Sequence, residues 1–459
     1  FENIPAKEKF SYVIISSSKS VKEDGTTLNE LEYIATDENL VPFEKTTEGW
    51  FNFNKFYWIG KTSSSWHELS NWAATLAGTG TITECPPFDN SSLELYITNN
   101  SQNPLLIENE LVANLLNIPA EKSVEMNSRV TVQTVQNMGE MIFANEISVQ
   151  ELNNNGSIFV NSGILTAENY ESISGKINLR EGATLEITTE GEKSVPELIV
   201  EKTADENDFA TISTNGNLTI SSAVYKVNGE SVDIQTNGNI SLPKTTEENT
   251  IGKLKIESGE LTIETLNVTS LNVVAGTFKN TTMNVTSVEN AGTIESTTVN
   301  VAGDLSNDGT MNVATTNIGG NLNDTGTWLA EGEINFVGTG EHEFDSNSST
   351  TYAKINVEKT SGILTIKDVL DVTELNINSN VIFEKSATIG ELSIDMSSSE
   401  NENFVKFAGE KLYKITTLES AKGNQTQKLT LGSTNEEKWN VNFENIPAKE
   451  KFSYVIISS

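Results

Sequence analysis

Apolar and polar positions repeat every 16 or 17 residues along the middle of the chain, between residues 259 and 328. Glycines mark the period at Gly259, Gly276, Gly292, Gly309 and Gly326. Two positions after each glycine stands a large apolar residue, which gives the column Leu261, Phe278, Ile294, Met311 and Trp328. Three further apolar columns share the interval and begin at Leu266, Val268 and Leu271. A polar column stands two positions before the later glycines and consists of Asn290, Asn307 and Asp324.

Between the columns, apolar and polar residues alternate, as in TMNVTSVENAGTIES at 282–296. This is the period of a β-strand that is buried on one face. Residues one period apart would lie on neighbouring strands, about 4.8 Å from each other, so that like residues stack into ladders. Each turn would bury its apolar columns only against its neighbours. The sequence therefore predicts an all-β fold, a single-stranded parallel β-helix over residues 79–407.

The first 17 residues of the chain, FENIPAKEKFSYVIISS, recur unchanged at residues 443–459. This repeat indicates a period of 442 residues, so that the chain would cover one unit and the first strand of the next. Short alternating stretches separated by turn residues flank the predicted β-helix. We expect a small β-sandwich junction shared between successive units, with its N-terminal half at 1–57 and its C-terminal strands at 408–459.

The repeated segment contains the strand that we expect to join successive units. Its C-terminal copy should pair with residues 439–446 across the turn at Pro447. Identical units would then associate with one another as a head-to-tail filament. The alternating side chains of the strand and of its copy are Phe10, Tyr12, Ile14, Phe452, Tyr454 and Ile456.

A tryptophan-rich stretch, YWIGKTSSSWHELSNW, precedes the predicted β-helix at 57–72. We interpret residues 58–78 as a cap that seals the open first turn, because exposed end turns need covering. The alternative is a binding site in which the tryptophan rings stack on sugars. The residues that define the element are Trp58, Gly60, Trp66, Asn71 and Trp72.

This W-x-G…W…N-W element, followed by Pro86-Pro87 and the strand LELYITNN, resembles large repetitive surface proteins of spirochaetes, Bacteroidetes and related bacteria. In that family the element stands just ahead of a parallel β-helix. The resemblance implies secretion to the cell surface and a role in adhesion or in envelope structure. It implies little about any catalytic activity.

The charge balance excludes several classes of function. With 64 acidic and 30 basic residues the net charge is −34, so the basic footprint of a nucleic-acid-binding protein is missing. Attraction to an anionic membrane surface is disfavoured for the same reason, and no apolar run is long enough for insertion. The single cysteine, Cys85, cannot form a disulfide within the chain, and the two histidines, His67 and His342, are far apart in the sequence.

No group of residues predicts catalysis or a cofactor. Asp304, Asp308 and Asp324 are close in the predicted turns, but basic partners for acid–base chemistry are missing, so we read Asp324 as part of the polar ladder. His342 reads as a solvated loop residue rather than as a metal ligand. Residues 303–309 and 203–209 offer oxygen ligands for weak binding of a divalent cation such as calcium, but neither stretch has EF-hand spacing.

The function we expect is that of a non-catalytic, structural tandem-repeat unit of an extracellular fibre or sheath. The alternative is the stalk of a giant bacterial adhesin that binds a host surface or polysaccharide. A more distant alternative is a β-helix enzyme that acts on polysaccharides.

Overall fold

The computed structural model assigns the chain to the all-β class. About 60% of the residues lie in strands and about 2% in helices, and the strands form about 16 turns of a parallel β-solenoid. The structure describes residues 54–82, 84–203, 205, 208–398, 402–435, 437–445 and 447–458, and ahead of them only the short strands β1 to β4. The predicted fold class is therefore confirmed.

The chain divides into two compact units. Unit 1 comprises residues 1–199 and 213–222, and unit 2 comprises residues 200–212 and 223–459. At the N-terminus, β1 (Ser20–Val21) pairs with β2 (Thr27–Leu28) and β3 (Phe43–Thr46) pairs with β4 (Gly49–Asn52), both antiparallel. β18 (Glu192–Glu201) and β19 (Ala210–Val224) contain residues of both units.

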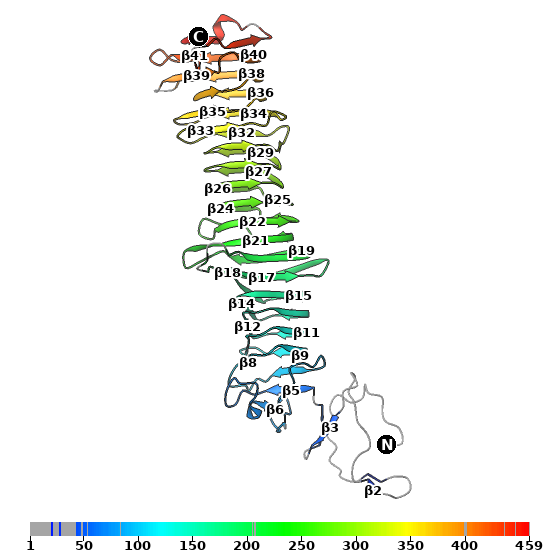
Figure 1. Cartoon of the computed structure of the whole chain (residues 1–459). Coiled ribbons are helices and arrows are strands. Elements are labelled where there is room, and N and C mark those ends of the chain that lie inside the picture. The colour runs from blue at the N-terminus through cyan, green and yellow to red at the C-terminus, as the bar shows by residue number, and fades with distance from the viewer. Residues whose placement is uncertain are drawn as a thin grey trace. The chain divides into compact units, whose positions relative to one another are not determined.

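The strands of unit 1 follow one another in chain order and stack turn upon turn (Figure 1). Its elements are β5 (Lys55–Trp58), the 3-10 helix η2 (Leu69–Asn71), β6 (Trp72–Ala73), β7 (Glu94–Ile97), β8 (Leu105–Ile107), β9 (Leu111–Ile118), β10 (Ser123–Met126), β11 (Val130–Asn137), β12 (Glu140–Phe143), β13 (Ile147–Asn154), β14 (Ser157–Val160), β15 (Gly163–Glu171), β16 (Lys176–Arg180) and β17 (Ala183–Ile187).

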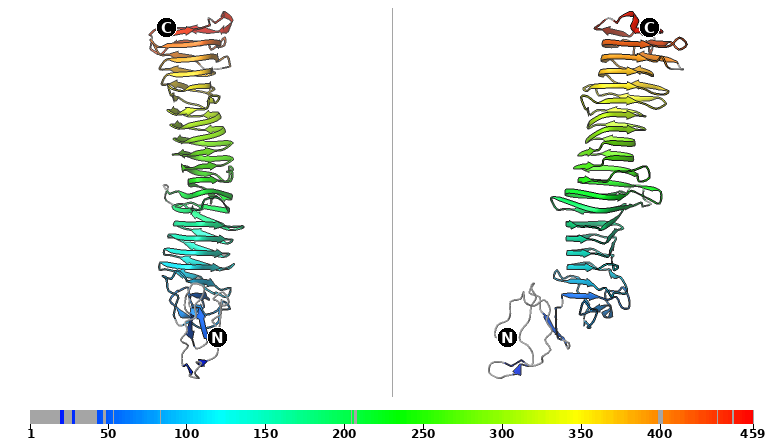
Figure 2. Two further views of the ribbon diagram at one scale, coloured as in Figure 1. Left: turned by 90° about the vertical axis from the view of Figure 1, so that its right-hand side faces the viewer. Right: turned by 180° about the vertical axis from the view of Figure 1, so that it is seen from behind.

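Unit 2 continues with the same kind of turn, which two further views show from the side and from behind (Figure 2). Its elements are β20 (Lys226–Val227), β21 (Glu230–Ser241), β22 (Ile251–Ser258), β23 (Glu260–Thr262), β24 (Thr265–Val273), β25 (Thr277–Lys279), β26 (Thr282–Asn290), β27 (Thr293–Val301), β28 (Leu305–Asn307), β29 (Thr310–Ile318), β30 (Leu322–Asp324), β31 (Thr327–Trp328), β32 (Glu333–Phe336), β33 (His342–Asp345), β34 (Thr351–Val357), β35 (Ile363–Ile366), β36 (Leu370–Ile377), β37 (Asn380–Phe383), β38 (Ala387–Asp395), β39 (Asn403–Phe407), β40 (Leu412–Lys422), β41 (Leu429–Ser433), β42 (Asn440–Phe443), the 3-10 helix η3 (Lys449–Lys451), β43 (Phe452–Ser453) and β44 (Val455–Ile457).

A typical turn of unit 2 consists of one long and one short strand, as in β24 and β25. The long strand bends at a corner at Thr269. Its parallel register with β26 includes residues 265–268 and 270–273 but not this residue. Buried and outward side chains alternate on both sides of the corner. Turns approach so closely that a Cβ added at Gly276, whose φ is +82°, would lie 2.2 Å from the carbonyl oxygen of Gly259. The corner glycines thus allow the turns to stack.

The apolar columns lie inside the solenoid in the register that their spacing predicts. Leu261 pairs with Phe278, which pairs with Ile294, and the column continues to Met311 and Trp328. All five side chains are buried. Residues 111–118, whose spacing of apolar residues also suits a helix, form the strand β9.

The boundaries predicted for the solenoid, residues 79 and 407, are wrong. At the N-terminal side, β5 already pairs in parallel with β7. At the C-terminal side, β40 pairs in parallel with β38, and β41 with β39. The antiparallel sandwich strands expected at 408–459 are therefore further solenoid turns. Alternation of buried and exposed residues is the same in both architectures, and it does not give the direction of the partner strand.

The pairing expected across Pro447 is also wrong. Residues 440–443 (β42) lie parallel to β40, and residues 455–457 (β44) lie parallel to β41. Phe452 begins β43, whereas Phe10, Tyr12 and Ile14 lie outside the described residues. A sandwich junction is not seen in the part of the chain that the structure describes.

Candidate functional site

The tryptophans of the predicted cap form one buried cluster in unit 1. The ring centroids of Trp58 and Trp66 lie 4.9 Å and 5.0 Å from that of Trp72, in edge-to-face contacts. Each indole N–H donates to a backbone carbonyl: Trp58 to Asn103, Trp66 to Pro86 and Trp72 to Trp66. Because the three rings are at most 3% exposed, they are not available to stack on sugars. Their position favours the interpretation as a cap.

Gly60 and Asn71 fix the loop that carries these tryptophans. The Asn71 side chain is fully buried and accepts hydrogen bonds from the backbone N–H groups of Thr62 and Ser63, at 2.9 Å and 3.2 Å. Gly60 has a φ of +50°, and a Cβ there would lie 2.5 Å from the carbonyl oxygen of Asn103. The residues after Asn71, Trp72 and Ala73, form β6, which pairs antiparallel with β5.

The polar column of unit 2 is a buried ladder inside the solenoid. The Asn290 amide donates to Oδ1 of Asn307, and the Asn307 amide donates to Oδ1 of Asp324, both at 2.8 Å. The ladder ends at Tyr352, whose hydroxyl donates to Oδ2 of Asp324 at 2.5 Å. Burial, followed by the Asp324 charge, raises the pKa of Tyr352, which keeps this donor protonated. The side chains of the ladder are buried and bond to one another, whereas Oδ1 of Asn290 has no hydrogen-bond partner among the described residues.

Unit 1 contains a similar buried ladder that the sequence reasoning missed. The Asn137 amide donates to Oδ1 of Asn154 at 2.8 Å, and the Asn154 amide donates to the hydroxyl of Tyr170 at 3.4 Å. The signal was an Asn two residues before Gly139 and Gly156, the same spacing that marks the ladder in unit 2.

The acidic residues considered for catalysis do not converge. Asp304 accepts a hydrogen bond from the backbone N–H of Asn321 at 2.7 Å, and Asp308 accepts one from the Thr325 hydroxyl at 2.5 Å. Among the described residues, no group of three or more His, Cys, Asp or Glu side chains could hold a metal ion. Residues 204, 206 and 207 of the second candidate cation loop lie outside the described residues.

His342 is not the solvated loop residue that we expected. It begins β33 and is half-buried, and its Nδ1 lies 2.6 Å from Nζ of Lys359, which is only 6% exposed. Burial and then the Lys359 charge lower the pKa of His342, while burial lowers the pKa of Lys359. The two residues are 17 positions apart, but the turns are longer here than in 259–328, because His342 pairs in register with Leu364, 22 positions later.

An outward-facing asparagine ladder runs along one face of unit 2 and was also missed. Side-chain amides donate from each turn to the turn before it at 2.6–2.8 Å, through Asn267, Asn284, Asn300, Asn317, Asn335, Asn356 and Asn376. The sequence signal is an asparagine between two inward residues, as in LNV, MNV, VNV and TNI, repeated in successive turns.

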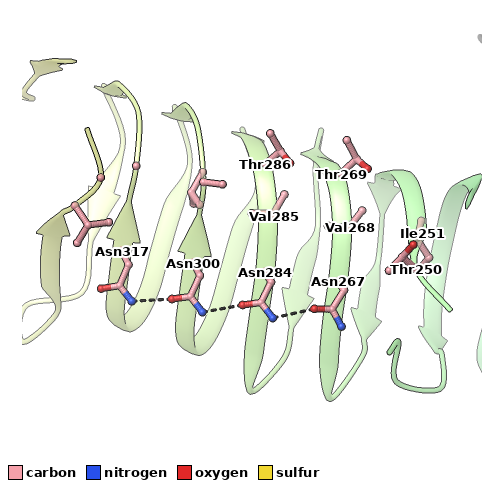
Figure 3. A pocket seen from close by; sticks show the side chains of 15 residues that line it. Thr250, Ile251, Asn267, Val268, Thr269, Asn284, Val285, Thr286, Asn300 and Asn317 are labelled. Carbon is pink, nitrogen blue, oxygen red and sulfur yellow. Dashed lines mark hydrogen bonds between the residues drawn. The ribbon is translucent and has the colours of Figure 1, made fainter. Parts of the chain in front are cut away.

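A shallow groove of about 630 Å³ lies beside the first four asparagines of this ladder. Its floor is the corner between two faces of the solenoid, where Val268 and Val285 meet Thr269, Thr286 and small residues of the later turns (Figure 3). None of the 15 residues that line the groove is charged. The groove is the candidate binding site that we consider below.

Comparison of the chain with protein-family models, with curated proteins and with solved structures finds no match. In the part of the chain that the structure describes, no helix is both long and apolar enough to cross a membrane.

Proposed function

We propose that this chain is one unit of a tandemly repeated, non-catalytic structural protein of the bacterial cell surface. Its role would be mechanical: a spacer of stacked β-turns joined head to tail with identical units. The observation that carries the proposal is the place of the second copy of the repeated segment. Two strands of that copy, β43 and β44, pair in parallel with β40 and β41 and so belong to the last described turn.

In the proposed tandem array, the next unit would cover side chains of this last described turn. Tyr454 is 52% exposed, Ile456 45% and Ile457 67%. A final turn also leaves backbone N–H and C=O groups without partners on its outer edge, and such an edge favours pairing with another strand. In a tandem array the sequence that follows would supply the next turn and cover these groups.

The N-terminal edge of unit 1 is closed in a different way. β6 pairs antiparallel with β5 on one side, while β7 pairs in parallel with it on the other. A preceding unit therefore could not stack directly on β5. In our proposal the connection runs through the sequence between residues 18 and 54.

Hydrogen exchange can test the proposal on a protein in which residues 1–442 are followed by residues 1–459. The amide groups of the internal copy of residues 452–457 should exchange at least tenfold more slowly than those of the terminal copy. The repeated segment occurs three times in this protein, and peptides that begin before residue 443 and extend past the segment into the next unit identify the internal copy. The strands β32 and β34 provide the control and should exchange equally in both units.

Equal exchange in the two copies would contradict a continuous junction. If single units instead sediment as dimers that dissociate on dilution, a donor-strand contact between separate chains would replace the tandem junction.

The second candidate function, the stalk of an adhesin, is favoured by the uncharged groove of unit 2. An enzyme is the distant alternative. Under our proposal, the purified protein shows no lyase or hydrolase turnover on acidic polysaccharides. Turnover that disappears on replacing Asp304, Asp308 or Asp324 by Asn would overturn the non-catalytic part of the proposal.

A further inference from the structure

We infer that the groove beside the outer asparagine ladder of unit 2 binds a linear, neutral polysaccharide of hexose units, laid along the stacking direction of the turns. The inference rests on the unused hydrogen-bonding capacity of the ladder, on the absence of charged residues from the groove and on the spacing of the asparagines. It does not depend on the proposed tandem arrangement.

The asparagines beside the groove keep free hydrogen-bonding capacity. An Asn side chain has two N–H donors and an oxygen with two lone pairs. Within the ladder, Asn284 and Asn300 each donate one N–H to the previous turn and accept one from the next. In the part of the chain that the structure describes, neither has another side-chain partner. Each therefore presents one donor and one acceptor to a ligand with hydroxyl groups.

Beyond the groove, glutamate side chains accept hydrogen bonds from the remaining N–H groups of the same ladder. The Asn376 amide donates to Oε1 of Glu374 at 2.7 Å as well as to Asn356, and the Asn356 amide also donates to Glu333. Lys354 bridges the same two glutamates, at 3.1 Å from Glu374 and 3.8 Å from Glu333. Both side-chain N–H groups of Asn356 and of Asn376 thus have partners, unlike those of Asn284 and Asn300.

The residue two positions before each asparagine explains this difference. In the groove turns this column is threonine, Thr265, Thr282, Thr298 and Thr315 in parallel register. In the following turns it continues as Glu333, Lys354 and Glu374. The groove turns therefore form an uncharged strip on a chain with a net charge of −34. A neutral ligand fits this strip, whereas an anionic polymer would meet repulsion from the rest of the surface.

The spacing of the ladder matches a repeating ligand. Neighbouring asparagines lie one strand spacing apart, so the four beside the groove span about 14 Å. One sugar ring of an extended chain has nearly the length of one such step. Successive rings would each meet one asparagine, while the methyl groups of Val268 and Val285 contact the ring carbons at the groove floor.

Binding of cellohexaose and mannohexaose, measured by calorimetry on the full chain, tests the inference. The full chain should bind at least one of them and should not bind the anionic control, oligogalacturonate. Ala302→Tyr fills the groove from an exposed corner and should abolish binding. Ala314→Tyr is the matched control, an exposed corner alanine outside the groove, and should bind like the unsubstituted chain.

A second pair of variants tests the ladder itself. Asn300→Ala should weaken binding at least fivefold, because it removes one donor and one acceptor from the groove. Asn376→Ala disrupts the same ladder outside the groove and should change the affinity less than twofold. Circular dichroism and thermal unfolding check that each variant folds.

Three results would overturn the inference: no binding of either neutral hexasaccharide, unchanged binding by Ala302→Tyr, or equal losses for Asn300→Ala and Asn376→Ala. If Ala302→Tyr changes only the sedimentation of the protein, the groove is instead a lateral contact between copies of this chain.

Discussion

Replacement of Phe278 tests the stacking register of unit 2 at one buried position. Phe278 is fully buried in the short strand β25, between Leu261 of the turn before and Ile294 of the turn after. Phe278→Ala should lower the free energy of unfolding by about 3–5 kcal/mol, since it removes a buried ring and leaves a cavity. Phe278→Asp should cost more, because it also buries a carboxylate for which this apolar column offers no partner.

The loss should be local, since each solenoid turn contacts mainly its neighbours. Hydrogen exchange locates this loss of stability better than a single global unfolding curve, because long stacks of turns need not unfold in a two-state transition. A loss of 3–5 kcal/mol corresponds to an increase in exchange of about two to three and a half orders of magnitude. The increase should be confined to β23, β25, β27 and adjacent strands, while β11 and β13 of unit 1 keep their rates.

Thr269→Ala is the control for Phe278→Ala, since Thr269 lies at an exposed corner of β24 in the same turn. It should change stability by less than about 0.5 kcal/mol. The reasoning would be refuted if Phe278→Ala cost no more than this control, or if Phe278→Asp left exchange in the neighbouring turns unchanged.

The remaining predictions concern a pH effect, the buried ladder and the cap. The pKa of His342 lies below its ordinary value of 6.5 through burial and the Lys359 charge. The unfolded chain therefore takes up this proton at higher pH than the folded chain, and unfolding free energy falls as pH decreases below about 6.5. His342→Gln should flatten this dependence in urea titrations from pH 7.5 to 5, and an unchanged slope would contradict it. Tyr352→Phe should destabilise unit 2 by about 1.5–3 kcal/mol, because it removes a donor from the buried Asp324 carboxylate; a loss below 0.5 kcal/mol in urea unfolding would contradict this. Trp66→Ala should cost about 3–5 kcal/mol, seen as faster exchange at β5 and β7; unchanged exchange with lost sugar binding would favour the ligand alternative.

The interior of unit 2 could be predicted from the sequence because the repeat period fixes which residues meet. Once Phe278 and Ile294 are one turn apart, stacking places both in the same column, whatever the loops between them do. The buried Asn290–Asn307–Asp324 ladder follows from the same spacing. Its end at Tyr352 does not, because the intervening turn is longer and Tyr352 is 28 positions from Asp324.

The chain ends could not be predicted in the same way. Apolar and polar residues alternate in 408–459 as they would in sandwich strands. Only the partner strands identify solenoid turns, as where Val455 pairs with Leu429, 26 positions earlier. The His342–Lys359 contact does not follow from the 17-residue period either, because the turns are longer here and His342 pairs in register with Leu364, 22 positions later. The outer ladder was missed because its asparagines stand between apolar residues and read as ordinary exposed strand positions.

The most direct measurement of the central claim is the structure, by cryo-electron microscopy, of a protein in which two units follow each other. We predict that the internal copy of residues 443–459 forms a solenoid turn parallel to β40 and β41, and that the following residues lead from it into the next unit without an interruption of the strand pairing. The claim would be contradicted if the internal copy left this position, or if the two units were joined by an unpaired linker.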